Sequence, residues 1–232
     1  MGALAMALKW QMMMAAAKRT YTVKVYSDPG HGLNSVDGTL RRWGWFLSWA
    51  NVRDGAGVQA FPDDGVASAH IYSETLPWPR WHAINRAIMT FYLDPALIPP
   101  GLVITKAVYW LHVIQMYDQL QIDPTFGLVE SHPIAPNNLV PADYQNLDST
   151  PISTILPYES IVSEWRSLEV LPAYLSLLVS GQILQLGLRE MKYDAANIEP
   201  HWDAWRISGF DFWTVDAADP DKRPYLEVTI DP

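Results

Sequence analysis

The amino-acid sequence predicts an all-β protein built as an antiparallel β-sandwich, with long loops and one short helix. Several runs alternate apolar and polar residues with the period of two that a half-buried strand requires. Proline and glycine separate these runs and stop a long helix from forming between them. The chain does not alternate strand-like and helix-like segments, as a parallel α/β fold would.

The clearest pair of strands flanks a proline-rich connection in the middle of the chain. One face of the first strand carries apolar side chains only: Ala87, Met89, Phe91 and Leu93. The second strand repeats this pattern with Ala107, Tyr109, Leu111 and Val113. Between them lie Pro95, Pro99, Pro100 and Gly101. Both strands are therefore expected to turn one face to a core.

Weaker patterns predict the elements before and after this pair. Residues 21–26 predict a strand that ends at a turn, and residues 33–79 predict short strands joined by long loops. The segment 115–160, rich in Pro, Asn, Asp and Ser, predicts a long connection with a turn or two of helix. Strands are expected within 163–170, 184–188 and 205–215, a short helix at 172–180, and an acidic hairpin at 216–223. The last strand places Leu226, Val228 and Ile230 on one face.

The order and pattern of three runs resemble a known family. RAIMTFYLDPALIPPGLVITKAVYWLHV (86–113), LQLGLREMKYD (184–194) and RPYLEVTI (223–230) resemble the DNRLRE and carbohydrate-binding-module-like β-sandwiches of phage virion proteins and bacterial surface proteins. The resemblance covers residues 68–230 and implies a jelly roll, with one domain over 20–232 and an arm over 1–19. It carries no catalytic residues, so it implies a protein that is not an enzyme.

Charge and composition exclude some classes of partner. The 232 residues carry a formal net charge of −9, and the 16 Lys and Arg are scattered along the chain. Binding to nucleic acid or to an acidic membrane needs clustered positive charge, so neither is expected. Cys is absent, which excludes disulfide and thiolate chemistry.

The arm and the tryptophans are the candidate contact residues. The apolar segment before residue 18 predicts contacts with another subunit through Leu4, Leu8, Trp10, Met12, Met13 and Met14. Its alternative is a signal peptide that starts at Met6 and is cleaved near Ala15–Ala17. The candidate ligand- or partner-binding residues are Trp43, Trp45, Trp49, Trp78 and Trp81. Trp43, Trp45 and Trp49 are expected on one strand face. Three alternative roles are open for these tryptophans: they cap the core, form a subunit interface or bind a glycan.

The sequence contains no motif for a metal or a catalytic centre. The acidic residues 216–221 do not match an EF-hand, although a looser calcium site there, or at Asp63 and Asp64, is an alternative to solvated turns. No cofactor is expected. The prediction is a non-enzymatic virion structural protein, a capsid-decorating or tail-associated subunit of a phage that contacts itself and other virion proteins. The alternative is a carbohydrate-binding or adhesive module of a cell-surface or secreted protein.

Overall fold

The structure, a computed structural model, describes residues 20–27, 37–62, 64–74, 80–135, 138–161 and 164–231. The arm residues Leu4, Leu8, Trp10, Met12, Met13 and Met14 lie outside this range, as do Asp63 and Trp78. The predictions made for these residues therefore stay predictions.

The described part of the chain contains twelve strands, and all of their pairings are antiparallel. They are β1 (Tyr21–Tyr26), β2 (Gly38–Leu47), β3 (Gln59–Pro62), β4 (Val66–Ser73), β5 (Trp81–Tyr92), β6 (Val103–Asp118), β7 (Thr125–Glu130), β8 (Leu156–Pro157), β9 (Trp165–Glu169), β10 (Ile183–Glu190), β11 (Ile207–Trp213) and β12 (Tyr225–Asp231). The all-β fold predicted from the sequence is confirmed.

The helices are short. They are the α-helix α2 (Trp49–Asp54), the 3-10 helices η2 (Pro141–Gln145), η3 (Tyr158–Ser160), η4 (Pro172–Leu177) and η6 (Pro220–Lys222), and the π-helix η5 (Met191–Ala195). The helix predicted at 172–180 is present as η4, but α2 was not predicted. Its N-cap, Ser48, accepts a hydrogen bond from the backbone of Asn51, which is a common start signal for a helix.

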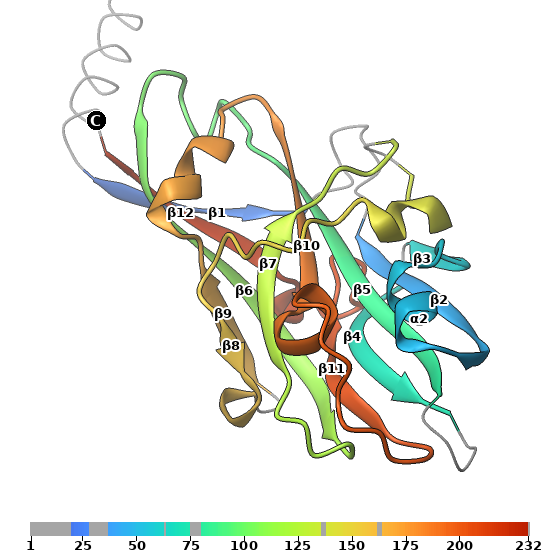
Figure 1. The fold of residues 1–232 in the computed structure, drawn as a ribbon. Coiled ribbons are helices and arrows are strands. Elements are labelled where there is room, and N and C mark those ends of the chain that lie inside the picture. The colour runs from blue at the N-terminus through green and yellow to red at the C-terminus, as the bar shows by residue number, and fades with distance from the viewer. Residues whose placement is uncertain are drawn as a thin grey trace, which may run out of the picture.

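Eight of the strands form a jelly roll (Figure 1). One sheet, which we call sheet A, has the order β1-β12-β6-β9, and the other, sheet B, has the order β5-β10-β7-β8. Along the chain the eight strands pass back and forth between the sheets, with β1, β6, β9 and β12 in sheet A and β5, β7, β8 and β10 in sheet B. This is the topology that the sequence led us to expect.

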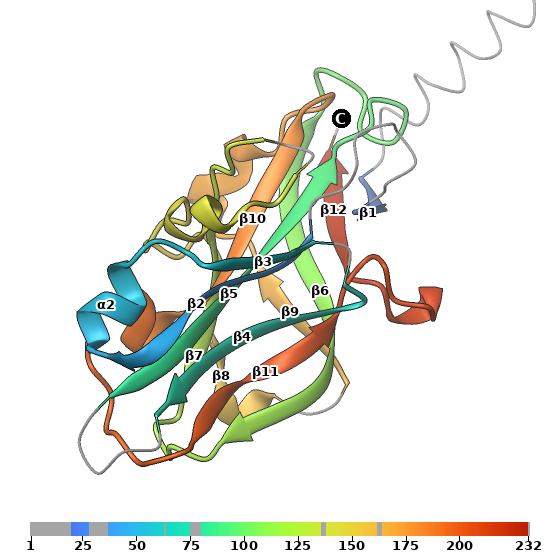
Figure 2. The same cartoon turned by 90° about the vertical axis from the view of Figure 1, so that its right-hand side faces the viewer.

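The other four strands extend the jelly roll on one side. β11 pairs with the end of β6, and β4 connects β11 to β5. β2 pairs with the opposite edge of β5 and also carries β3. Sheets A and B are therefore joined through β6, β11, β4 and β5 into one curled sheet, and Figure 2 shows β4 between β5 and β11.

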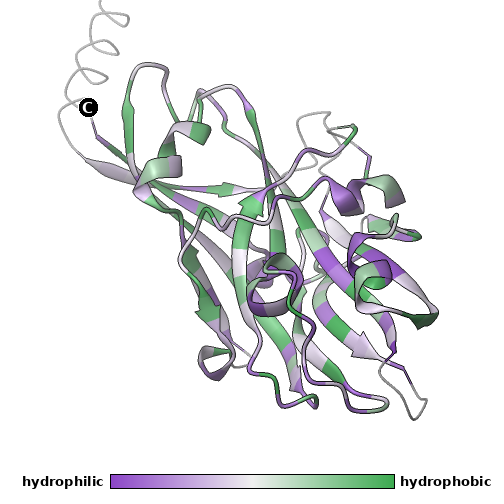
Figure 3. Cartoon of the chain, in the orientation of Figure 1, coloured by the Kyte–Doolittle hydropathy of each residue, from purple (hydrophilic) through white to green (hydrophobic). Residues whose placement is uncertain are grey.

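The main core lies between the two sheets. The apolar faces predicted for β5 and β6 meet there, and the rings of Phe91 and Tyr109 lie 5.9 Å apart across it. Phe126 of β7 and Phe210 of β11 pack edge to face at 4.6 Å. Hydrophobic and hydrophilic residues alternate along several strands, as Figure 3 shows. Burial of this apolar surface is the main source of stability.

A second core covers the outer face of sheet B. Ile84 and Ile88 of β5 point away from the main core and pack with Val52 of α2 and Tyr144 of η2. β5 is therefore buried on both faces, where the sequence predicted one buried face. The pattern did not show this because the covering helices come from distant parts of the chain.

Two predictions about connections were wrong. β6 continues to Asp118, and β7 lies inside the segment 115–160 that was expected to be a connection. β7 shows no alternation because Leu128 faces the main core and Val129 faces the second core. Residues 216–223 do not form a hairpin, since β11 and β12 do not pair with each other and the segment crosses between them through η6.

Candidate functional site

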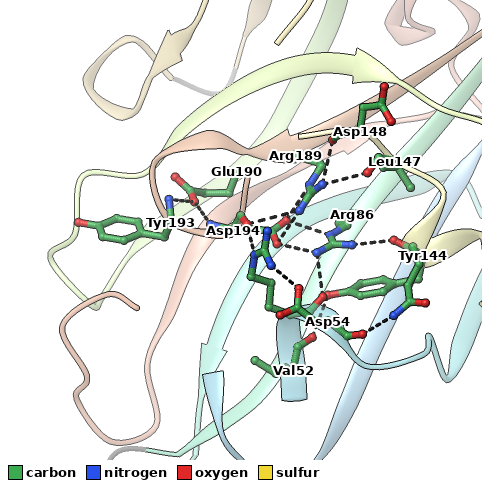
Figure 4. Close-up of polar contacts among 12 residues, drawn as sticks. Val52, Asp54, Arg86, Tyr144, Leu147, Asp148, Arg189, Glu190, Tyr193 and Asp194 are labelled. Carbon is green, nitrogen blue, oxygen red and sulfur yellow. Dashed lines mark hydrogen bonds and ion pairs between the residues drawn. The ribbon is translucent and has the colours of Figure 1, made fainter. Parts of the chain in front are cut away.

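A buried cluster of charged side chains lies in the second core, between sheet B and its covering helices (Figure 4). Asp194 of η5 is completely buried and accepts hydrogen bonds from Arg86 of β5 and Arg189 of β10. The four donor–acceptor distances lie between 2.6 and 3.1 Å. Each arginine therefore binds the carboxylate through two nitrogens, which is the strong geometry for such a pair.

The remaining nitrogens of both guanidinium groups also have acceptors. Arg86 donates to the carbonyl groups of Tyr144 and Arg53, and its guanidinium lies 3.9 Å above the Tyr144 ring. Arg189 donates to the carbonyl groups of Leu147 and Asp148. Burial alone would raise the pKa of Asp194, but the two guanidinium groups outweigh burial and lower this pKa to about 2.

A second carboxylate holds the backbone beside this cluster. Glu190 caps η5 by accepting hydrogen bonds from the backbone N–H groups of residues 192, 193 and 194, and it also accepts one from Thr125. Burial raises the pKa of Glu190, and these hydrogen bonds oppose that rise. A hollow of about 370 Å³ borders Arg86 and Arg189, but their nitrogens are already engaged. We conclude that the cluster holds η5, α2 and η2 on sheet B.

An open groove lies where β2, β3, β4 and β5 adjoin. It has a volume of about 370 Å³ and is lined by Arg41, Trp43, Gln59, Tyr72, His82 and Ala83. Residues directly opposite each other in antiparallel strands share a face of the sheet. One row across the strands is Gln59, Arg41, Asn85 and His70, and the next row is Trp43, Ala83 and Tyr72. The groove therefore follows one face of four adjacent strands, and small Ala83 lies between the two aromatic rings.

A bulge brings His82 to this groove. On β4, Tyr72 is opposite Ala83 and Ser73 is opposite Trp81, so His82 has no partner there. An extra residue of this kind bends a strand and redirects its side chain. His82 lies 5.3 Å from the Trp45 ring and 6.0 Å from the Trp43 ring, measured between centroids.

A second bulge, on β2, shapes the rim of the groove. β2 shifts register between Trp43 and Leu47, and Phe46 there has a φ of 59°. Bulky residues rarely adopt this left-handed conformation, and such strain is concentrated at functional sites. The bulge leaves Trp45 61% exposed and Phe46 54% exposed at the rim.

A chain of polar contacts continues from the groove into the protein. Arg41 Nε donates to Asn85 Oδ1 at 2.9 Å, and Asn85 Nδ2 lies 3.4 Å from His70 Nδ1. His70 Nε2 lies 3.3 Å from Asp211 Oδ1, although without hydrogen-bond geometry. Tyr117 donates to the other oxygen of Asp211 at 3.2 Å.

Burial keeps His70 neutral. It lowers the pKa of His70 to about 4, with a smaller contribution from Arg41, and the opposing effect of Asp211 does not compensate. Gly209 leaves room for the imidazole, since a Cβ at this position would lie 2.6 Å from the ring and 2.0 Å from the carbonyl oxygen of Ala69. At pH 7 the positive charge in this part of the groove therefore belongs to Arg41.

The five predicted tryptophans do not form one surface. Trp43 and Trp45 lie at the groove and its rim, as described above. Trp49 lies on α2 and not on the strand face that was expected, and it is buried against Trp81 with centroids 5.1 Å apart. Trp81 is fully buried and its indole donates to Glu199 at 2.8 Å, so these two residues offer no free ring to a ligand.

Sequence reasoning did not find the other groove residues. Arg41 and Trp43 lie two positions apart in the region 33–79, where short strands were predicted without bounds, and this spacing is the only local signal that they share a face. Gln59, Tyr72 and His82 come from three other strands and gave no such signal.

Other candidate sites are less complete. Within the described ranges no group of three or more His, Asp or Glu residues is placed to hold a metal ion. In the acidic turn, Asp219 accepts a hydrogen bond from the backbone of Asp221 and pairs with Lys222 at 3.4 Å. A hollow of about 460 Å³ between β1 and neighbouring loops is lined by residues that include Lys24 and Asp94. Among the described residues no helix is long and apolar enough to cross a membrane.

Comparisons with known proteins do not assign a family. No family model matches the chain, and no curated protein matches it. Among solved structures it is similar to the K1 cleaved adhesin domain of Lys-gingipain from Porphyromonas gingivalis W83, with 12% identity, a TM-score of 0.24, and coverage of 91% of this chain and 97% of that chain. A similarity of this strength carries no argument about function. The resemblance to the DNRLRE and carbohydrate-binding-module-like family stays a prediction.

Proposed function

We propose that this protein is a glycan-binding module that acts by binding and not by catalysis. The observation that carries the proposal is the groove, where the rings of Trp43 and Tyr72 lie beside the polar side chains of Arg41, Gln59 and His82. Sugar rings have apolar faces that pack on aromatic rings and hydroxyl groups that need hydrogen bonds. The volume of about 370 Å³ is within the usual range of ligand pockets, about 300–1,000 Å³.

The groove also has the rigidity that selective binding requires. Its side chains stand on paired strands, and the bulge at His82 is fixed by a contact of 3.2 Å between His82 Nδ1 and the buried carboxylate of Glu74. A preformed site loses little conformational entropy when a ligand binds.

A glycan array followed by titration of intrinsic tryptophan fluorescence tests the proposal. We expect glycan-dependent quenching with the native protein, and a loss of affinity of at least tenfold in Trp43→Ala. The matched control is Trp165→Ala, which removes a half-buried tryptophan that packs on Tyr225 in sheet A, outside the groove. Equal binding by both variants, or no binding to any glycan, would contradict the proposal.

The virion structural role predicted from the sequence stays a prediction. Its contact residues, Leu4 to Met14, lie outside the described residues, and no comparison supports it. The two roles are compatible, because a virion subunit can carry a glycan-binding groove. Deletion of residues 1–19 followed by measurement of the mass in solution tests the predicted assembly, which requires the full-length protein to be oligomeric and the deletion variant to be smaller.

A further inference from the structure

We infer that the groove recognises an acidic sugar, and that Arg41 binds the carboxylate of a uronic acid residue. This inference rests on the proposed function and names the class of glycan.

Arg41 is held in place, but its outer nitrogens have no partner in the described part of the chain. Its Nε donates to Asn85, and its guanidinium carbon lies 5.1 Å from the centre of the Phe61 ring. Among the residues that the structure describes, Arg41 makes no ion pair, and its two terminal nitrogens donate no hydrogen bond. A fixed guanidinium with two free nitrogens matches the two oxygens of a carboxylate.

The rest of the groove also favours a ligand group that only accepts hydrogen bonds. None of the six lining residues is acidic. Tyr72 has its pKa raised by burial, so it stays protonated and can donate, and the amide of Gln59 can donate as well. His82 is not one of these donors, because its Nδ1 donates to Glu74 and the Nε2 of a neutral imidazole then accepts. An ionised carboxylate is an acceptor only, so it suits this set of donors better than a hydroxyl group alone does.

The nearby carboxylates are already occupied. Asp211 lies beyond His70 and interacts with His70, Ser68 and Tyr117, while Glu74 is buried beside His82. Neither lines the groove. The charge of Arg41 is therefore not neutralised by a direct partner, in a protein whose net charge is −9. That charge lies beside Trp43, so one pyranose ring could pack on the indole while its carboxylate reaches Arg41.

Matched ligands test this inference directly. Oligogalacturonate, oligomannuronate and hyaluronan fragments are each compared with their methyl esters, which keep the sugar rings but remove the charge. We expect one acidic ligand to bind at least tenfold more tightly than its ester to the full-length protein, measured by calorimetry and by tryptophan fluorescence. In Arg41→Met we expect the acid and the ester to bind equally, whereas Arg206→Met, which removes a surface arginine paired with Asp203, should keep the preference.

The outcomes separate this inference from the proposed function. Binding of neutral glycans that depends on Trp43, without any preference for an acid over its ester, would overturn the acidic-sugar inference and leave the glycan-binding function intact. A preference for the acid that persists in Arg41→Met would overturn the role of Arg41. Failure of every glycan to bind would overturn both. Circular dichroism of Arg41→Met checks that lost binding does not come from lost folding.

Discussion

Two regions of this molecule use arginine in opposite ways. In the buried cluster, every guanidinium nitrogen of Arg86 and Arg189 donates to Asp194 or to a carbonyl group. In the groove, Arg41 has one fixed nitrogen, and its other two have no partner among the described residues. The hydrogen bonds of the cluster are complete within the chain, so its arginines stabilise the fold. The groove is incomplete, and an incomplete donor set at an open surface is where a ligand is expected.

The largest expected effect comes from breaking the cluster. Asp194→Ala leaves two buried guanidinium groups without their carboxylate, and removal of one partner from a buried ion pair costs about 3–5 kcal/mol. We expect this decrease in the free energy of unfolding in urea titrations. Asp203→Ala, which removes an exposed ion pair with Arg206, is the control and should leave stability nearly unchanged. A small effect of Asp194→Ala would mean that the cluster does not hold the outer layer.

The next largest effect is a dependence of stability on pH that is caused by the buried His70 next to the groove. His70 has a pKa of about 4 in the folded state and about 6.5 when unfolded, so between these values only the unfolded state takes up the proton. Stability is therefore expected to fall by roughly 3 kcal/mol as the pH decreases from about 6.5 to about 4. His70→Gln should flatten this part of the curve, as measured by urea titration at each pH.

The pKa of Asp194 predicts a separate loss at lower pH. Because this pKa is lowered, the stabilisation by its ionised form is present above about pH 4 and disappears as the pH falls towards 2. The His70→Gln variant should retain this second loss. Two separate pH ranges of lost stability would therefore distinguish the contribution of Asp194 from that of His70.

A smaller effect is expected from one hydroxyl group in the cluster. Tyr144→Phe removes the hydrogen bond from Tyr144 to the carbonyl of Val52, which joins η2 to α2 at 3.0 Å. The buried carbonyl loses its partner, so we expect a decrease of about 1–2 kcal/mol in the free energy of unfolding. The contact of Arg86 with the aromatic ring at position 144 should remain. A loss of stability as large as that of Asp194→Ala would contradict the smaller contribution expected from the hydroxyl group.

The smallest expected effect on stability comes from the groove. Arg41→Met removes one hydrogen bond to Asn85 and should lower the free energy of unfolding by about 1 kcal/mol or less. The same substitution at Arg86 should be far more damaging, because Arg86 is buried and fully bonded. Thermal unfolding of the two variants side by side measures the contrast, which fails if Arg41→Met is as destabilising as Arg86→Met.

Local patterns predicted the strands that have one apolar face. β6 and β12 alternate clearly because most of their outward-facing residues are only partly buried, and both strands lie where the sequence indicated, although β6 runs on to Asp118. β7 was missed because both of its faces are buried. A strand of that kind loses the period of two on which the prediction depends.

The two arginine regions were harder to predict than the strands. Arg86 has the expected pattern of an outward-facing charge, and nothing near it in the sequence shows that Asp194, 108 positions later, covers it. Trp43 and Trp45 were chosen for their aromatic character, and they do lie at the groove. Their neighbours Tyr72 and His82 join them only through strand pairing and the bulge, which are properties of the folded chain.

The pairing of β1 with β12 has a mechanical consequence. Tyr21 is opposite Ile230, so the polypeptide enters and leaves the jelly roll side by side. A pulling force applied between these two points would act on the end of one strand pair and peel it apart one residue pair at a time, the geometry in which a sheet resists least. A force between the groove and Ile230 would instead be carried from β12 through β6, β11 and β4 to β5, along the strand pairs of the curled sheet. The path between the two ends therefore crosses one strand pair, whereas the path from the groove to Ile230 crosses four.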